Sequence, residues 1–172
     1  ANDAFGVFEV GMNHAGEIAP LSRMIRPHVA IITTVEAAHI EFFDSIEAIA
    51  DAKAEIFSGM EGGTAVLNRD NPMYERLAAA ARASGVGQIL AFGEHESADI
   101  RLVSYAGDAD GCSVRADIRG QAIDYRTGTP GKHLVMNSLA VLAAVSAIDA
   151  DVAAAARSLQ DLAAGAGRGQ RH

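Results

Sequence analysis

The fold is decided by residues 64–93, which read TAVLNRDNPMYERLAAAARASGVGQILAFG. Short apolar runs at the two ends of this stretch flank a helical pattern that starts at Asn71-Pro72 and stops at Gly85. Asparagine is favoured just before a helix, proline is favoured in the first turn, and glycine is favoured just after the last turn. A strand, a helix and a second strand in this order predict a right-handed crossover between parallel strands.

The same alternation extends toward the N-terminus. Near-continuous apolar runs, typical of strands covered on both faces of a sheet, occur at residues 5–10, 29–35, 64–68 and 88–93. Helical patterns lie between them, at residues 17–26, 44–58 and 71–85. The alternation predicts an α/β fold with a mainly parallel sheet flanked by helices.

The pattern changes at residue 99. Residues 99–127 read as short alternating strands, which predicts a small antiparallel meander joined to the main sheet. Alternate residues of this meander point to the same face of it, namely Cys112, Val114, Ala116 and Ile118. Two alanine-rich helices are expected at residues 133–148 and 150–163. We expect residues 1–172 to form one domain that contains this meander.

The composition excludes several classes of protein. The chain has 172 residues, of which 49% are hydrophobic, enough to bury a core. A net charge of -8 argues against binding to nucleic acid or to an anionic membrane surface, because both require clustered basic residues. The single cysteine, Cys112, excludes an intramolecular disulfide, and the apolar runs are far shorter than the ~20 residues of a membrane span. We expect a soluble, cytoplasmic protein.

Polar residues follow the ends of three predicted strands. Glu9 ends the first strand, Glu36 and His39 follow the second, and Asp70 follows the third. In open α/β sheets, ligands bind beyond the carboxyl ends of the strands, so this edge is the predicted ligand site. Glu9 shares a strand face with apolar residues, and a buried carboxylate needs a metal, a cation or several hydrogen bonds. A structural ion pair is the alternative for Glu9.

Lys53 lies on the apolar stripe of the helix predicted at residues 44–58. A lysine there pairs with an acid, extends its amine toward solvent or is chemically special, and we expect a pair with Glu9. Residues 131–133, Gly-Lys-His, followed by Asn137, open the next helix. Backbone amides at such a helix start can hold an anion, although a capping role is the alternative.

Three stretches in these regions carry a resemblance. Residues 8–18, Phe-Glu-Val-Gly-Met-Asn-His-Ala-Gly-Glu-Ile, resemble the Glu-Met-Gly-x-Asn-His-x-Gly-Glu-Ile segment of the Mur ligases, specifically of the MurF type. Residues 37–41, Ala-Ala-His-Ile-Glu, are similar to the His-Leu-Glu element of the family. Residues 50–57, Ala-Asp-Ala-Lys-Ala-Glu-Ile-Phe, are similar to its Ala-Lys-x-Glu-Ile-Phe element.

Three further motifs follow in the family's order. Residues 68–71, Asn-Arg-Asp-Asn, resemble the Asn-x-Asp-Asn turn, and Gly167-Arg168 resembles the terminal Gly-Arg motif. Residues 131–137 resemble the Gly-x-His-Asn-x-x-Asn motif, with Leu134 in place of its first asparagine. The resemblance therefore covers nearly the whole chain.

The resemblance implies the central domain of an ATP-dependent ligase of peptidoglycan precursor synthesis, with a P-loop NTPase-like fold. The MurF type adds D-alanyl-D-alanine to UDP-N-acetylmuramoyl-tripeptide through an acyl phosphate. Implied ligands of Mg2+ are Glu9, His39 and Lys53, and implied nucleotide contacts are Asn137, Arg168 and Asp70. Lys53 and His39 are the implied catalytic residues. Many family members carbamylate this lysine with CO2, which turns the amine into an anion.

The family's phosphate loop, which ends in Gly-Lys-Thr or Gly-Lys-Ser, would lie upstream of Glu9. Residues 131–132 do not replace it, because neither a strand nor the Gly-x-x-x-x-Gly spacing precedes them. We therefore expect a truncated domain that lacks its first strand and has no turnover of its own. Alternatives are another Mur ligase or folylpolyglutamate synthase-type amide ligase, and a non-catalytic α/β binding module.

Overall fold

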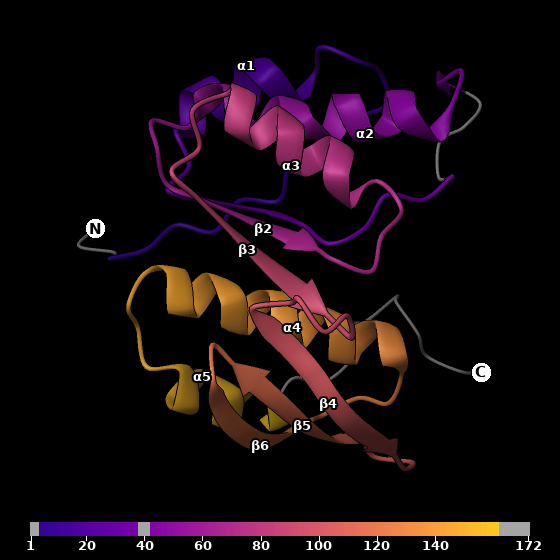
Figure 1. Cartoon of the computed structure of the whole chain (residues 1–172), viewed down its shortest axis with the longest axis vertical. Coiled ribbons are helices and arrows are strands. Elements are labelled where there is room, and N and C mark those ends of the chain that lie inside the picture. Colours follow the sequence, from indigo (N-terminus) through magenta and orange to yellow (C-terminus); the bar gives the residue numbers. More distant parts are fainter. Residues whose placement is uncertain (1–3, 38–41, 162–172) are drawn as a thin grey trace.

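The computed structural model describes residues 4–37 and 42–161, which form one mixed sheet between two layers of helices (Figure 1). The sheet has six strands in sequence order: β1 (Val29–Ile32), β2 (Thr64–Asn68), β3 (Gln88–Gly93), β4 (Ile100–Gly107), β5 (Cys112–Ile118) and β6 (Gln121–Thr127). β1 to β4 pair in parallel, whereas β4, β5 and β6 pair antiparallel. The predicted α/β fold and its meander are both confirmed.

The helices cover the two faces of the sheet. α1 (Ile18–Ile25), α2 (Ile46–Ala54) and α3 (Tyr74–Ala83) lie on one side, and α4 (Lys132–Ala147) and α5 (Val152–Ser158) lie on the other (Figure 1). Short 3-10 turns follow α2 and α5, as η2 (Glu55–Gly59) and η3 (Leu159–Asp161). None of the helices within residues 4–37 and 42–161 has both the length and the apolar character needed to cross a membrane.

β2 shows why the apolar runs are nearly continuous. Ala65 and Leu67 face the cluster beneath α2 and α3, whereas Val66 faces the cluster beneath α4. All three side chains are completely buried. A strand with helices on both faces needs apolar residues at every position, which is the pattern that identified it in the sequence.

The predicted strand at residues 5–10 is wrong. Phe5 and Val7 are 69% and 97% exposed, and this segment forms no strand. Aromatic and β-branched residues favour a strand, but a strand also requires a partner for its backbone groups. β1 pairs with β2 and is the outermost strand of the sheet, so in the described part of the chain no ladder extends to residues 5–10.

Two helices start slightly later than predicted. Ser45, rather than Asp44, caps α2, because its hydroxyl accepts the Ala48 N–H at 3.1 Å. The side chain of Asn71 accepts the Met73 N–H at 2.9 Å, so Asn71 forms a turn that precedes α3.

Two further predicted helix ends concern α3 and α5. Gly85, with φ +79, follows the last turn of α3 as predicted. The helix expected at residues 150–163 begins at Val152 and changes to the 3-10 turn η3 at Leu159, while residues 162–163 lie outside the described part.

The meander packs on α4 through the face that the sequence indicated, with Tyr125 of β6 among the buried residues. The Tyr125 hydroxyl lies 2.6 Å from Oγ of Ser138 on α4, and Ser138 donates to the Val135 carbonyl at 2.6 Å. Since the Ser138 proton goes to that carbonyl, Tyr125 must be the donor to Ser138. Burial raises the pKa of Tyr125 to about 12, against the smaller opposing effect of the Ser138 hydrogen bond.

Because the pKa of Tyr125 is raised, we expect the stability of the fold to depend on pH in the alkaline range. The unfolded pKa is about 10, so the preference for the neutral phenol is fully present below about pH 10 and is lost as the pH rises toward 12. We expect Tyr125→Phe to remove an alkaline loss in the free energy of unfolding that reaches about 1 kcal/mol at pH 11. Urea denaturation of both proteins from about pH 8 to 11 measures this. Parallel alkaline losses in the two proteins would contradict the assignment.

Candidate functional site

Two asparagines join the carboxyl ends of β1 and β2. The Asn68 amide donates to the Thr33 carbonyl at 3.1 Å, and its oxygen accepts the Asp70 N–H at 2.9 Å. The Asn71 amide donates to the Val35 carbonyl at 3.0 Å. The Asn-x-Asp-Asn turn therefore holds the edge of the sheet at which a ligand site was predicted.

Asp70 extends this network to β3. Its two carboxylate oxygens accept the backbone N–H groups of Glu94 and His95 at 2.7 and 2.9 Å. Gly93 has φ +152, and a Cβ atom there would lie 2.6 Å from the Asp70 carboxylate, so this approach requires glycine. Asp70 thus organises the β3–β4 loop, and its contact with a nucleotide stays a prediction.

An ion pair connects Glu94, the residue after β3, to the start of α4. The Lys132 amine lies 2.7 Å from the Glu94 carboxylate, which raises the pKa of Lys132. Gly131, with φ +131, precedes the helix and provides no side-chain cap. The start of α4 is therefore fixed at the carboxyl edge of the sheet, and Asn137 lies exposed on its next turn.

Lys53 is half-buried near the end of α2, on the apolar side that the sequence indicated. Burial lowers the pKa of its amine, and the Glu36 carboxylate opposes this with a smaller raising effect. The predicted ion pair with Glu9 does not form, and Lys53 has no ion pair with any residue that the structure describes. Lys53 is thus a poorly solvated amine, with Glu36 as the acid that influences it.

Glu9 is exposed, contrary to the prediction of a buried carboxylate. The reason is that residues 5–10 are not covered as a strand in the sheet would be. His39 and Arg168, the other predicted metal and nucleotide ligands, lie outside the described residues. Within residues 4–37 and 42–161, the structure brings together no group of three His, Cys, Asp or Glu side chains suited to a metal.

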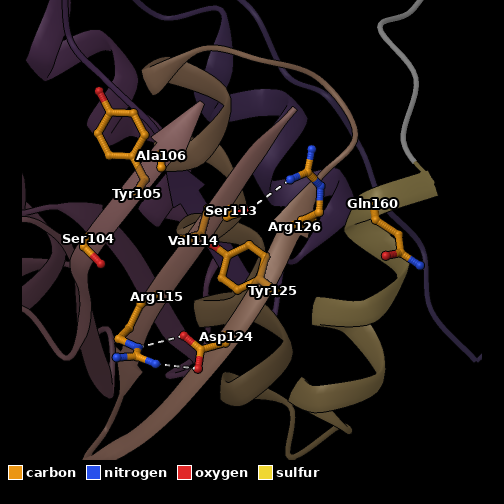
Figure 2. A pocket seen from close by; sticks show the side chains of 10 residues that line it. All are labelled: Ser104, Tyr105, Ala106, Ser113, Val114, Arg115, Asp124, Tyr125, Arg126 and Gln160. Atoms are coloured by element: carbon orange, nitrogen blue, oxygen red, sulfur yellow. Dashed lines mark hydrogen bonds and ion pairs between the residues drawn. The ribbon is translucent and has the colours of Figure 1, made fainter. Parts of the chain in front are cut away.

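A groove of about 590 Å³ lies on the meander, away from these strand ends (Figure 2). Its charged residues are paired with each other or with neighbours. The Arg115 guanidinium lies 2.7 Å from Asp124, and Arg126 lies 2.9 Å from Asp108. With its arginines neutralised in this way, the groove offers little attraction to an anionic ligand, and we place the candidate site at the carboxyl edge of β1 to β3.

Sequence reasoning missed several residues that organise this site. Glu36 was recognised as a residue at a strand end but was not assigned to the site. The pairing of Glu94 with Lys132 joins residues far apart in the sequence, and no local pattern indicates it. Gly93, directly after a buried run and before a polar loop, was a signal that another group approaches the backbone there.

The sequence of the chain is similar to a known protein family. The sequence matches the Mur ligase middle domain over residues 1–145, and the chain therefore belongs to the Mur ligase family. Among its relatives is the UDP-N-acetylmuramoyl-tripeptide--D-alanyl-D-alanine ligase of Rickettsia prowazekii, 31% identical over 167 residues. That alignment covers 96% of this chain and 37% of the relative, so the chain spans little more than a third of that protein.

Solved structures agree with this placement. MurF from Acinetobacter baumannii superposes with a TM-score of 0.85 at 25% identity, over 92% of this chain and 34% of that one. MurF from Thermotoga maritima in complex with ADP gives a TM-score of 0.72 at 23% identity, over 84% of this chain and 33% of that one. Within the family, the similarity is thus to the MurF type, and the fold is that of its central domain.

Proposed function

We propose that the chain is part of an ATP-dependent ligase that joins D-alanyl-D-alanine to UDP-N-acetylmuramoyl-tripeptide in peptidoglycan precursor synthesis. The observation that carries this proposal is the alignment of 96% of the chain with a ligase of that name. ADP in the Thermotoga maritima structure supports ATP as the nucleotide. A cytoplasmic location is part of this proposal.

The side chains of the site fit the chemistry of a magnesium ligase. A lowered pKa increases the neutral fraction of the Lys53 amine, and the neutral amine is the form that reacts with CO2. The resulting carbamate would be an oxygen donor, the type of ligand that Mg2+ prefers. Glu9 is an exposed carboxylate without an ion pair among the described residues, so its oxygens are available to a cation.

Each residue has a proposed task in this reaction. When bound, ATP supplies the phosphoryl group that activates a substrate carboxylate as an acyl phosphate, and Mg2+ neutralises the phosphate charge. Glu9, Lys53 and His39 would hold the metal. Asn137 would orient the base from α4, and Arg168 would approach the nucleotide. Asp70, besides fixing the β3–β4 loop, would lie beside the same nucleotide.

The full-length enzyme provides the test. With UDP-N-acetylmuramoyl-tripeptide, D-alanyl-D-alanine, ATP and Mg2+, we expect one phosphate released for each amide formed. Residues 1–172 alone should show no turnover, because their sequence contains no Gly-x-x-x-x-Gly-Lys-Thr/Ser phosphate loop. Turnover with UDP-N-acetylmuramate and L-alanine instead would assign another branch of the family. The absence of amide formation with every such pair would favour the non-catalytic alternative.

A further inference from the structure

Glu55 binds the start of α1 through both of its carboxylate oxygens. Oε1 accepts the Gly16 N–H at 2.6 Å, and Oε2 accepts the N–H groups of Ile18 and Ala19 at 3.2 and 3.1 Å. The first N–H groups of a helix have no partner within the helix, and a negative charge beside them is stabilising. Glu55 comes two residues after Lys53, so these bonds attach α1 to the segment that carries Lys53.

A second carboxylate fixes the turn immediately before α1. Glu17 accepts the Asn13 N–H at 2.8 Å and lies 3.1 Å from Nδ1 of His14. The His14 ring contacts the Phe42 ring, with 5.3 Å between centroids. The turn at residues 13–16 therefore touches the segment that follows His39 as well as the segment that follows Lys53.

This turn directly follows the segment that carries Glu9. Residues 4–10 belong to no strand, and Glu9 is exposed. Along the described part of the chain, the hydrogen bond nearest to Glu9 is the one from Asn13 to Glu17. The end of the segment that carries Glu9 is therefore held by the packing of Met12 on the core beneath α2 and α3 and by the adjoining turn at residues 13–16.

We propose that Glu55 is a positioning residue of the ligase site. It fixes the turn at residues 13–16 against the end of α2, and in this way it sets the position of Glu9 relative to Lys53. The inference rests on the proposed function for its effect on turnover. The effect of Glu55 on the turn itself can be measured without any substrate.

The packing of α1 on η2 has a separate anchor. Ser22 is completely buried, accepts the Gly59 N–H at 3.1 Å and donates to the Ile56 carbonyl. A Cβ atom on Gly59 would overlap the Ser22 backbone, which shows how closely the two segments approach. Because this contact does not involve Glu55, Ser22→Ala is a matched control that weakens the packing and leaves the carboxylate in place.

The experiment compares Glu55→Gln and Ser22→Ala in the full-length enzyme. Glutamine keeps the size of the side chain but removes its charge and places an NH2 group among N–H donors. We expect Glu55→Gln to lower kcat by about 10- to 100-fold and to raise the Mg2+ concentration for half-maximal rate several-fold. Hydrogen exchange should become faster in residues 13–19. Ser22→Ala should lower the Tm and leave kcat and the Mg2+ requirement unchanged below that temperature.

Two results would overturn the proposal: a Glu55→Gln enzyme with wild-type kcat and Mg2+ requirement, or the same change of Mg2+ requirement in Ser22→Ala. If the wild-type enzyme shows no ligase turnover, the proposed function fails, and hydrogen exchange decides the role of Glu55 separately. Unchanged exchange in residues 13–19 would then overturn it. Should Glu55→Gln not fold, Glu55→Asp is measured in the same assays, because it keeps the charge on a shorter side chain.

Discussion

Lys53→Ala in the full-length enzyme is expected to lower kcat by about 100- to 1,000-fold, and short carboxylic acids added to the assay should restore part of the rate. The proposed carbamate of Lys53 supplies an anionic oxygen to the metal. Alanine removes this oxygen and leaves space in which a small carboxylate can bind. An acid could not replace an ordinary ammonium group, which has the opposite charge. Rescue of the variant by carboxylic acids therefore distinguishes a carbamate of Lys53 from an unmodified ammonium group.

The structure supports the carbamate through the surroundings of this lysine. An amine that is half-buried and lacks an ion pair among the described residues is destabilised as a cation, which is why its pKa is lowered. The neutral fraction rises with pH, so carbamate formation should increase from neutral toward alkaline pH. Glu36 favours the ammonium form and opposes this change.

The measurement combines kinetics with NMR of isotope-labelled bicarbonate. A carbamate carbon should appear in the wild-type enzyme and be missing from Lys53→Ala. Propionate or acetate should increase the rate of the variant and leave the wild-type rate unchanged. Normal turnover of Lys53→Ala, or a wild-type spectrum without the carbamate carbon, would remove this role from Lys53.

Glu9→Gln is expected to abolish most turnover in the same enzyme, again by about 100-fold or more, with little change in Tm. Glutamine keeps the shape of the side chain and removes the charge that would bind Mg2+. The alternative role, a structural ion pair, predicts a loss of a few kcal/mol in stability when the pair is broken. Glu9 is exposed and forms no ion pair with a described residue, which favours the metal role.

A control for Glu9→Gln is available at the other end of the strands, where β2 begins. Glu61 is also exposed, and it lies in the loop that leads into β2. Glu61→Gln removes the same charge from the protein at a distance from the strand ends, so turnover should be unchanged. If both variants lose activity equally, or if Glu9→Gln keeps the wild-type rate at low Mg2+, Glu9 is not a metal ligand.

Segments whose structure depends on near neighbours in the chain were predictable from the sequence. β2 and β3 follow from near-continuous apolar runs, the meander follows from alternating residues, and the end of α3 follows from Gly85. The strand expected at residues 5–10 failed because a strand depends on a partner, which local sequence does not encode. The start of α3 moved because the Asn71 side chain satisfies a turn before the helix begins.

The sheet edge that carries the candidate site could be derived from the sequence, whereas most contacts within it could not. The carboxyl edge of the sheet follows from the α/β topology, and the inward position of Lys53 follows from helical periodicity. Which acid influences the pKa of Lys53 depends on the spatial arrangement of separate elements, and here it is Glu36 instead of Glu9. In the same way, two backbone amides of the β3–β4 loop engage Asp70, although its sequence context alone suggested a ligand contact.

β4 joins the two parts of the sheet unequally. It pairs with β3 over two residue pairs, from Phe92 with Ile100 to Gly93 with Arg101, but with β5 over seven. α4 contacts strands on both sides of this narrow seam, so the helix carries much of the connection between the parallel strands and the meander. The orientation of the meander relative to the parallel strands therefore depends more on the packing of α4 than on backbone pairing between β3 and β4.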